Sequence, residues 1–177
     1  MRIEVENLTA AGEPFEHTYR AEEVELEEEG AQLVADVAVR GRATKKGETV
    51  RLRGEIGAEV ELLCDRCAAP ERRPLAVEFD TSFIPLEAEA VKTENVELQA
   101  EDLLLSAYEG GAVDLDELTR EQILLALPSR HLCREDCKGL CQKCGANLNA
   151  GDCSCGQGEV DPRWAALADL KKQVNGE

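Results

Sequence analysis

The sequence predicts an α+β protein: an antiparallel β-sheet, open or barrel-like, followed by helices and a small C-terminal cysteine-rich module. Three observations predict this class. Apolar and polar residues alternate over 35–43 and 50–63, a capped helical segment starts after Asp114, and six of the eight cysteines lie between residues 129 and 158. We expect a mainly antiparallel β domain at 1–113. Residues 114–177 should then form a helix, the cysteine-rich module and a terminal helix packed on it.

The clearest predicted element is a β-hairpin whose turn is Lys45-Lys46-Gly47-Glu48. Symmetric pairing about Lys46-Gly47 would gather six apolar residues on one face: Val37, Val39, Ala43, Val50, Leu52 and Ile56. The opposite face would then carry Arg40 opposite Arg53 and Arg42 opposite Arg51. The hairpin therefore has an apolar face and a face of four arginines. These arginines are candidates for contact with RNA or with an acidic strand, and Glu23, Glu25, Glu27, Glu59 and Glu61 are possible partners across the sheet.

Shorter strands are expected on both sides of this hairpin. Val24 and Leu26 alternate with glutamates, which predicts a strand at 23–27. Residues 76–83 predict another, with Val77, Phe79 and Phe83 on one side and Pro85 ending it. Residues 87–101 are acidic and weakly patterned, so we expect a loop with a short strand around Val96 and Leu98, then a strand or turn at 103–108.

Two helices are expected in the C-terminal part. Asp114 can accept hydrogen bonds from the free N–H groups of a first helix, which carries Leu118, Ile123, Leu124 and Leu127 and ends at Pro128. Asp161-Pro162 predicts the start of a final helix. That helix has apolar Trp164, Leu167 and Leu170, with Lys171 and Lys172 near its end.

The composition restricts the class of partner. The 177 residues have a formal net charge of −17, and no apolar run is long enough to span a membrane. The N-terminus does not resemble a signal peptide, so we expect a cytoplasmic protein with no membrane partner. Such an acidic chain repels phosphate at long range. Contact with RNA would therefore need a local basic patch, whereas a basic protein would be attracted.

In a reducing cytosol, the eight cysteines indicate metal ligands rather than disulfides. Two Cys-x-x-Cys pairs can each supply two zinc ligands from one tight turn. The simplest division gives one local site and one long-range site. The local site has Cys141, Cys144, Cys153 and Cys155, and the long-range site has Cys64, Cys67, Cys133 and Cys137. His131 could replace one ligand of the second site. We expect one or two zinc ions per chain, both structural, because four thiolates leave no position for a reactive water.

The run Cys133–Asn149, which reads CREDCKGLCQKCGANLN, resembles the signature of the YceD family of large ribosomal RNA subunit accumulation proteins. The upstream pair Cys64 and Cys67, the acidic middle segment, the segment EQILLALP at 121–128 and the closing Asp161-Pro162-Arg163-Trp164 agree with it. The resemblance implies a role in accumulation or processing of large-subunit ribosomal RNA. It supplies no catalytic residues.

Three classes of function remain to be weighed. The first is a non-enzymatic ribosome-assembly factor that engages an rRNA precursor or a basic ribosomal protein. The second is a thiol redox switch or redox-regulated chaperone, which would use the same cysteines. The third, a metal-dependent nuclease, lacks support because no phosphate loop or histidine constellation is present, and Asp114 with Asp116 fits a helix cap better than a two-metal site. We expect a non-enzyme without a small-molecule substrate.

Overall fold

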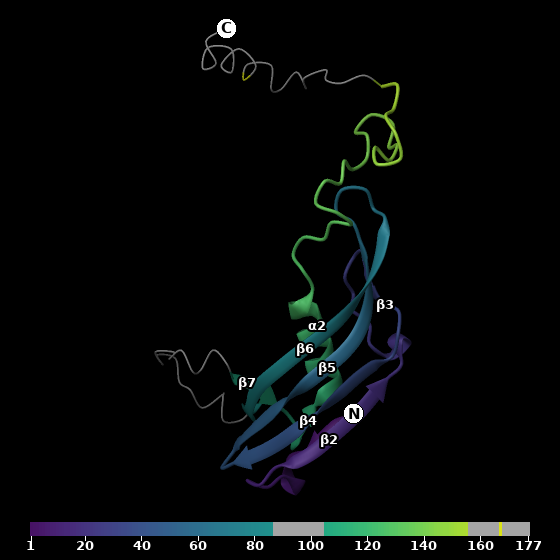
Figure 1. Ribbon diagram of the computed structural model, residues 1–177. Helices are drawn as coiled ribbons and strands as arrows, with labels where there is room; N and C mark the ends of the chain where they lie inside the picture. Colours follow the sequence, from purple (N-terminus) through teal and green to yellow (C-terminus); the bar gives the residue numbers. More distant parts are fainter. Residues whose placement is uncertain (87–104, 156–166, 168–177) are drawn as a thin grey trace.

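The computed structural model describes residues 1–86, 105–155 and 167, and these form a curled β-sheet around one helix (Figure 1). Five strands follow one another across the main sheet: β2 (Glu13–Tyr19), β4 (Val37–Lys46), β5 (Thr49–Leu63), β6 (Pro70–Pro85) and β7 (Leu105–Tyr108). β3 (Ala31–Leu33) also pairs with β5, and β1 (Arg2–Glu4) forms a separate pair with β8 (Ala112–Asp114). Short 3₁₀ turns occur at Val5–Asn7 and Ala21–Glu23, and helix α2 spans Leu115–Ala126.

The sheet is mostly antiparallel, and within the described ranges it is a half-barrel that stays open between β2 and β7. One pair departs from the prediction, because β6 and β7 run parallel. The alternation of side chains along a strand predicts which face is buried but not the direction of the neighbouring strand. The expectation of a purely antiparallel sheet is therefore wrong at this edge.

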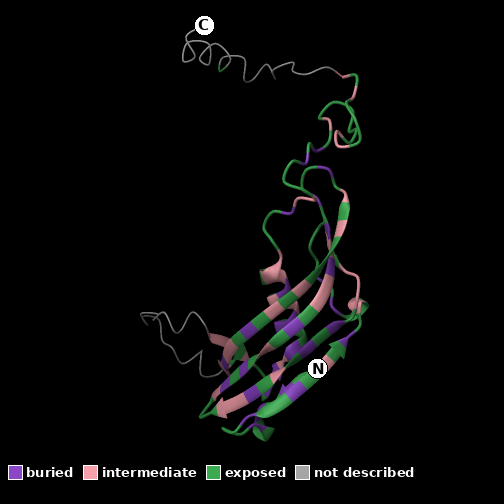
Figure 2. Cartoon of the chain, viewed as in Figure 1, coloured by how far each residue is buried: buried purple, intermediate pink, exposed green. Residues whose placement is uncertain are grey.

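The β4–β5 hairpin has the predicted faces but a different register. Lys46 pairs with Thr49, so Gly47-Glu48 forms the two-residue turn, and the positive φ of 65° at Gly47 suits the first turn position. Arg42 consequently lies opposite Arg53, and Arg40 lies opposite Glu55. The pairing differs from the predicted one by two residues, an even shift that leaves every side chain on its expected face. All six predicted apolar residues are buried (Figure 2).

A pair of glycines lies where the backbones of β4 and β5 approach each other closely. Gly41 pairs with Gly54, and Phe15 of β2 and Phe79 of β6 flank them in the same row. A Cβ on Gly54 would fall against the carbonyl oxygen of Arg40 and lie 2.8 Å from the Cα of Gly41. Only glycine fits this close approach of two backbones, and glycines at such positions allow a sheet to curl.

Helix α2 fills the concave side of the sheet. The Asp114 side chain caps it by accepting hydrogen bonds from the N–H groups of Asp116 (2.9 Å) and Glu117 (3.3 Å), as predicted. Leu115, Leu118 and Ile123 are buried in the same core as the strands. The helix ends one residue before the Leu127-Pro128 step, in agreement with the predicted stop.

Two other strand predictions need correction. Residues 24–28 form no strand: a 3₁₀ turn ends at Glu23, and Val24 and Leu26 are buried from an irregular segment. β6 begins at Pro70, six residues before the predicted start, and pairs with β5 as far as Leu63. The resulting long hairpin carries the Cys64–Cys67 turn far from the core.

Some predictions fall outside the described residues, namely the strand around Val96 and Leu98 and the final helix apart from Leu167. The division at residue 113 stays a prediction. No helix in the described part of the chain is long and apolar enough to cross a membrane.

Candidate metal centres

The turn between β5 and β6 places Cys64 and Cys67 side by side. Backbone hydrogen bonds close this turn, from the N–H of Cys64 to the oxygen of Ala69 (2.9 Å) and from the N–H of Ala68 to the oxygen of Cys64 (2.8 Å). Ala68 has a φ of 54°, in the left-handed region. Both cysteines are buried even though the turn lies at the end of a hairpin. Another segment must therefore cover them.

Residues 131–140 provide that cover. Asp65 and His131 exchange two hydrogen bonds: the N–H of Asp65 donates to the oxygen of His131 (2.9 Å), and the N–H of His131 donates to the Asp65 carboxylate (2.7 Å). The Arg66 guanidinium donates to the oxygen of Cys137 (2.7 Å), and the N–H of Leu140 donates to the oxygen of Arg66 (3.0 Å). These contacts place Cys133 and Cys137 over the turn. We call Cys64, Cys67, Cys133 and Cys137 the proximal centre.

The sulfur spacing of the proximal centre fits a tetrahedral metal site. The Sγ atoms of Cys64 and Cys137 are 3.8 Å apart, and those of Cys67 and Cys133 are 3.7 Å apart. All four lie within 4.8 Å of one another. Zinc–sulfur bonds of about 2.3 Å in a tetrahedron separate the sulfurs by roughly 3.8 Å. A disulfide needs an S–S bond of about 2.05 Å, so these are free thiols that can converge on one ion.

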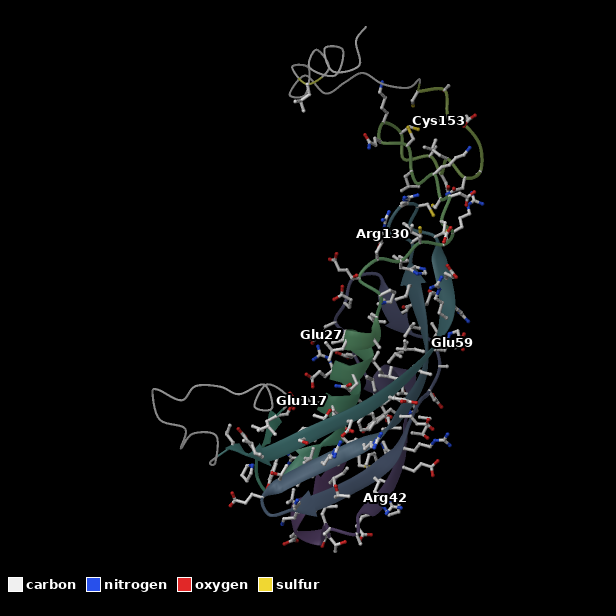
Figure 3. The ribbon with its side chains drawn as sticks, turned by 60° about the vertical axis from the view of Figure 1, so that its left-hand side comes forward. Glu27, Arg42, Glu59, Glu117, Arg130 and Cys153 are labelled. Atoms are coloured by element: carbon white, nitrogen blue, oxygen red, sulfur yellow. The ribbon has the colours of Figure 1, made fainter. Side chains whose placement is uncertain are left out.

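The other four cysteines form a second cluster in the module itself. Cys141, Cys144, Cys153 and Cys155, here the distal centre, also have ligand atoms within 4.8 Å of one another. Gly145, with a φ of 72°, donates its N–H to the oxygen of Cys141 (2.8 Å) and turns the chain directly after Cys144. This centre is only partly covered, and Cys144 is exposed. Figure 3 labels Cys153 beyond the tip of the long hairpin, at the end of the molecule opposite Arg42.

The two Cys-x-x-Cys turns share a pattern of N–H groups aimed at the first sulfur. Hydrogen bonds from the backbone of Cys133, Arg66 and Cys67 lower the pKa of Cys64 to about 6. Those from Cys144 and Lys143 lower the pKa of Cys141 to about 6. In both turns the donors include the second and third residues after the cysteine. Such donors stabilise a thiolate, the form that binds metal.

Cys133 and Cys155 depend more strongly on a cation to become charged. Burial, together with the neighbouring sulfurs, raises the pKa of Cys133 to about 12. Hydrogen bonding to Cys144, with burial, raises the pKa of Cys155 to about 12. Each cluster thus combines a favoured thiolate with a disfavoured one. A divalent cation would offset the repulsion among four thiolates in each cluster.

Asn149 supports the proximal centre and was absent from the sequence prediction. Its side-chain N–H₂ donates to the Cys137 sulfur at 3.3 Å. Its oxygen accepts from the N–H of Lys138 (2.8 Å) and from Arg134 (2.7 Å). Partners of this kind orient metal ligands. In the sequence, Asn149 is only the last residue of the run that resembles the family signature. Its distance from Cys137 along the chain does not predict that the two side chains are in contact.

His131 lies outside both cysteine clusters. Its ring is buried, with Nε2 at 3.4 Å from the Glu71 carboxylate, and neither ring nitrogen makes a hydrogen bond. The groups that could share a metal among the described residues are the two cysteine sets, and His131 belongs to neither. The structure therefore does not place it as a replacement ligand.

The four arginines share the outer face of the sheet, as predicted, but their partners differ from those expected. Arg40 pairs with Glu55, Arg51 pairs with Asp80 at 2.6 Å, and Arg53 lies 3.7 Å from the same aspartate. Arg42 donates to the backbone oxygen of Gly12. The expected glutamates are elsewhere, with Glu27 on Arg120 and Glu61 on Arg72. The register shift and the length of β6 bring Glu55 and Asp80 to these arginines.

Comparison with known proteins places the chain in context. The model of the family described as large ribosomal RNA subunit accumulation protein YceD matches residues 52–171, which include all eight cysteines. An Arabidopsis thaliana protein named "Large ribosomal RNA subunit accumulation protein YCED homolog 1, chloroplastic" is 36% identical over 74 residues, covering 42% of this chain and 23% of its own length. The family resemblance stated from the sequence is thereby confirmed.

Two bacterial relatives extend the match. An uncharacterized Mycobacterium bovis protein is 30% identical over 144 residues, covering 81% of this chain and 64% of its own length. The uncharacterized protein YlbN of Bacillus subtilis is 26% identical over 160 residues, covering 90% and 88%. The chain thus spans about a quarter of the plant relative and under two thirds of the mycobacterial one. No solved structure matches it.

Proposed function

Because this chain belongs to the YceD family, we propose that it is a non-enzymatic factor that supports accumulation of large-subunit ribosomal RNA. The observation that carries the proposal is the family match over residues 52–171, together with the chloroplast relatives from Arabidopsis thaliana and Zea mays that are named for this role. Its partner would be an rRNA precursor or a basic ribosomal protein.

We further propose that the proximal and distal centres each hold one structural zinc ion. Four thiolates complete a tetrahedron, so neither ion would keep an open position for a substrate or a reactive water. The proximal ion would fasten the C-terminal module to the β5–β6 hairpin, because its ligands come from both. The distal ion would fold the module internally. Both ions would thus stabilise the fold and take no part in catalysis.

The charges favour protein contact over direct RNA contact. Each filled centre would add two negative charges to a chain already at −17. Three of the four arginines on the outer face already face carboxylates, which reduces what they offer to phosphate. A basic ribosomal protein therefore fits the surface better than an rRNA precursor.

The role is tested by deleting the gene and comparing the ratio of large- to small-subunit rRNA with that of the parent strain. We expect the ratio to fall and the wild-type chain to restore it. A Cys64→Ser/Cys67→Ser chain should restore it poorly, whereas Cys144→Ala alone should retain most activity because it removes one peripheral ligand. An unchanged ratio in the deletion strain would refute the proposed role.

The exposure of the distal centre supports a second candidate, a thiol redox switch. Hydrogen peroxide can oxidise two thiolates to a disulfide, with peroxide reduced to water and the metal released. Cys144 is the exposed member of the set. If this is the function, sub-stoichiometric peroxide should change partner binding at fixed protein concentration. Binding that is indifferent to loss of the distal metal would argue against a switch.

A further inference from the structure

A groove of about 380 Å³ lies where three segments meet below the proximal centre. The first wall is formed by residues 28–31, which include the first residue of β3. The second is formed by the end of β5 together with Asp65. The third is the end of α2 and the linker that follows it, including Leu127, Pro128 and His131. None of these segments is a neighbour of the others in sequence. The groove is thus a product of the tertiary fold.

Two of the three walls of this groove carry carboxylates, and the third is formed by the C-terminal end of α2. The side chains of Glu28 and Glu29 are exposed and have no ion-pair partner among the described residues, in contrast to Glu27, which pairs with Arg120. Asp65 uses its carboxylate to accept from the N–H of His131. Helix α2 ends here without a basic residue in its last turn, so the negative end of its dipole is not offset. The groove is therefore suited to a cation.

The groove also offers apolar surface and one unused polar side chain. Leu63 is 43% exposed, which is high for a large apolar residue at the end of a strand, and Leu127 and Pro128 lie on the opposite wall. His131 is 5% exposed, and neither of its ring nitrogens has a hydrogen-bond partner. A buried ring nitrogen without a partner is costly unless a ligand supplies one.

We propose that this groove binds an arginine or lysine side chain from a basic protein segment. The alkyl stem would cover Leu63 and Leu127, and the charged head would reach the carboxylates of Glu28 and Glu29. The inference deepens the proposed function, on which it rests for its biological setting, because it names the partner as a basic protein.

Other ligands fit this groove less well. A phosphate backbone would be repelled by Glu28, Glu29 and the end of α2. A bare metal ion needs ligand atoms that converge, and the described groups close enough to share one are the cysteine clusters alone. A long side chain with a terminal charge satisfies both the apolar and the acidic walls.

The groove is coupled to the proximal centre through Asp65 and His131. Asp65 lies between the ligands Cys64 and Cys67, and His131 precedes Cys133 by two residues. The two hydrogen bonds between them join two walls of the groove. A metal that holds the four cysteines together therefore also fixes the width of the groove. Removing the metal should weaken binding without altering a groove residue.

The test uses the zinc-loaded full chain and a short fluorescein-labelled peptide of alternating arginine and leucine, with fluorescence anisotropy at physiological salt. We expect Glu28→Gln/Glu29→Gln to weaken binding by about tenfold, since two charge-assisted contacts are lost. The matched control Glu4→Gln/Glu6→Gln makes the same change in net charge on β1 and the first 3₁₀ turn. It should change affinity less than about twofold, as expected for screened distant charges. Leu63→Ser tests the apolar wall and should weaken binding several-fold.

Equal loss in the groove and control variants would show that the peptide responds only to net charge, and would overturn the proposal. So would tighter binding of a single-stranded RNA oligonucleotide than of the peptide. Insensitivity to Leu63→Ser would also count against the groove. These measurements use purified protein and are independent of the rRNA ratio, so a failed groove and a failed ribosomal role give different results.

Discussion

The proximal and distal centres have the same ligand set in opposite settings. The proximal sulfurs join residues that are 66 and 73 positions apart in sequence, and three of its four cysteines are buried. The distal ligands all come from 141–155, and none of them is buried. Closing a long loop removes more freedom from the unfolded chain than closing a short one. The proposed proximal ion would therefore support the tertiary fold, whereas the proposed distal ion would support one local module.

The largest effect should follow loss of the proximal thiols. In Cys64→Ser/Cys67→Ser, the zinc content should fall by one ion per chain, and the free energy of unfolding should fall by at least about 3 kcal/mol, because structural zinc binding is coupled to folding. Elemental analysis and urea unfolding measure the two quantities. Hydrogen exchange should show that the β5–β6 pairs near Leu63 and Pro70 open first. Full stability after loss of this ion would contradict the assigned difference between the centres.

An intermediate effect is expected from a change that leaves both centres intact. Gly54→Ala places a Cβ against backbone atoms of Arg40 and Gly41, which cannot move aside as a flexible side chain would. We expect destabilisation of about 1–3 kcal/mol from overpacking, with two zinc ions retained.

The matched control for Gly54→Ala is Gly57→Ala on the same strand, where a Cβ would meet nothing within 4 Å. Its unfolding midpoint in urea should stay close to that of the wild type. Loss of zinc in Gly54→Ala would show that sheet curvature and the metal centres are not independent.

The smallest effect on the sheet should follow loss of the distal thiols. Cys141→Ser/Cys144→Ser should release one zinc ion and expose 141–155 to protease, while urea unfolding of the β-sheet changes by less than about 0.5 kcal/mol. Limited proteolysis with mass spectrometry locates the cleavage. Unchanged metal content would refute the local assignment, and a large loss of sheet stability would remove the distinction from the proximal centre.

Several features of the fold could be predicted from local sequence. The apolar face of β4 and β5 follows from strict alternation, and the Asp114 cap and the Pro128 stop have direct physical causes. The local cysteine set follows from spacing, and the long-range set is what remains once zinc takes four ligands; the structure has both groups. Each of these predictions depends on neighbours in sequence or on a fixed ligand count.

Most of the wrong predictions depend on partners that are distant in sequence, and the hairpin register depends on the backbone conformation of one turn residue. The direction of β7 is set by the strand beside it, and the hairpin register is set by the conformation of Gly47. The predicted start of β6 is too late because prolines and arginines are not typical of strands. Pairing with β5 nevertheless makes a strand of the segment that contains Pro70, Arg72, Arg73 and Pro74. Strand β2 was missed because only Phe15 and Tyr19 in it are buried. The role of Asn149 depends on a contact that only the folded module creates.

The order of the proximal cysteines along the chain determines when each pair becomes available during translation. Cys67, the second cysteine of the turn, leaves the ribosome 66 residues before Cys133. At roughly 5–20 residues per second, this interval lasts about 3–13 seconds. During that time, a nascent chain presents a two-thiol turn that no second pair can yet complete. The β4–β5–β6 sheet can already form in this interval. Metal binding at the proximal centre would therefore follow formation of the sheet.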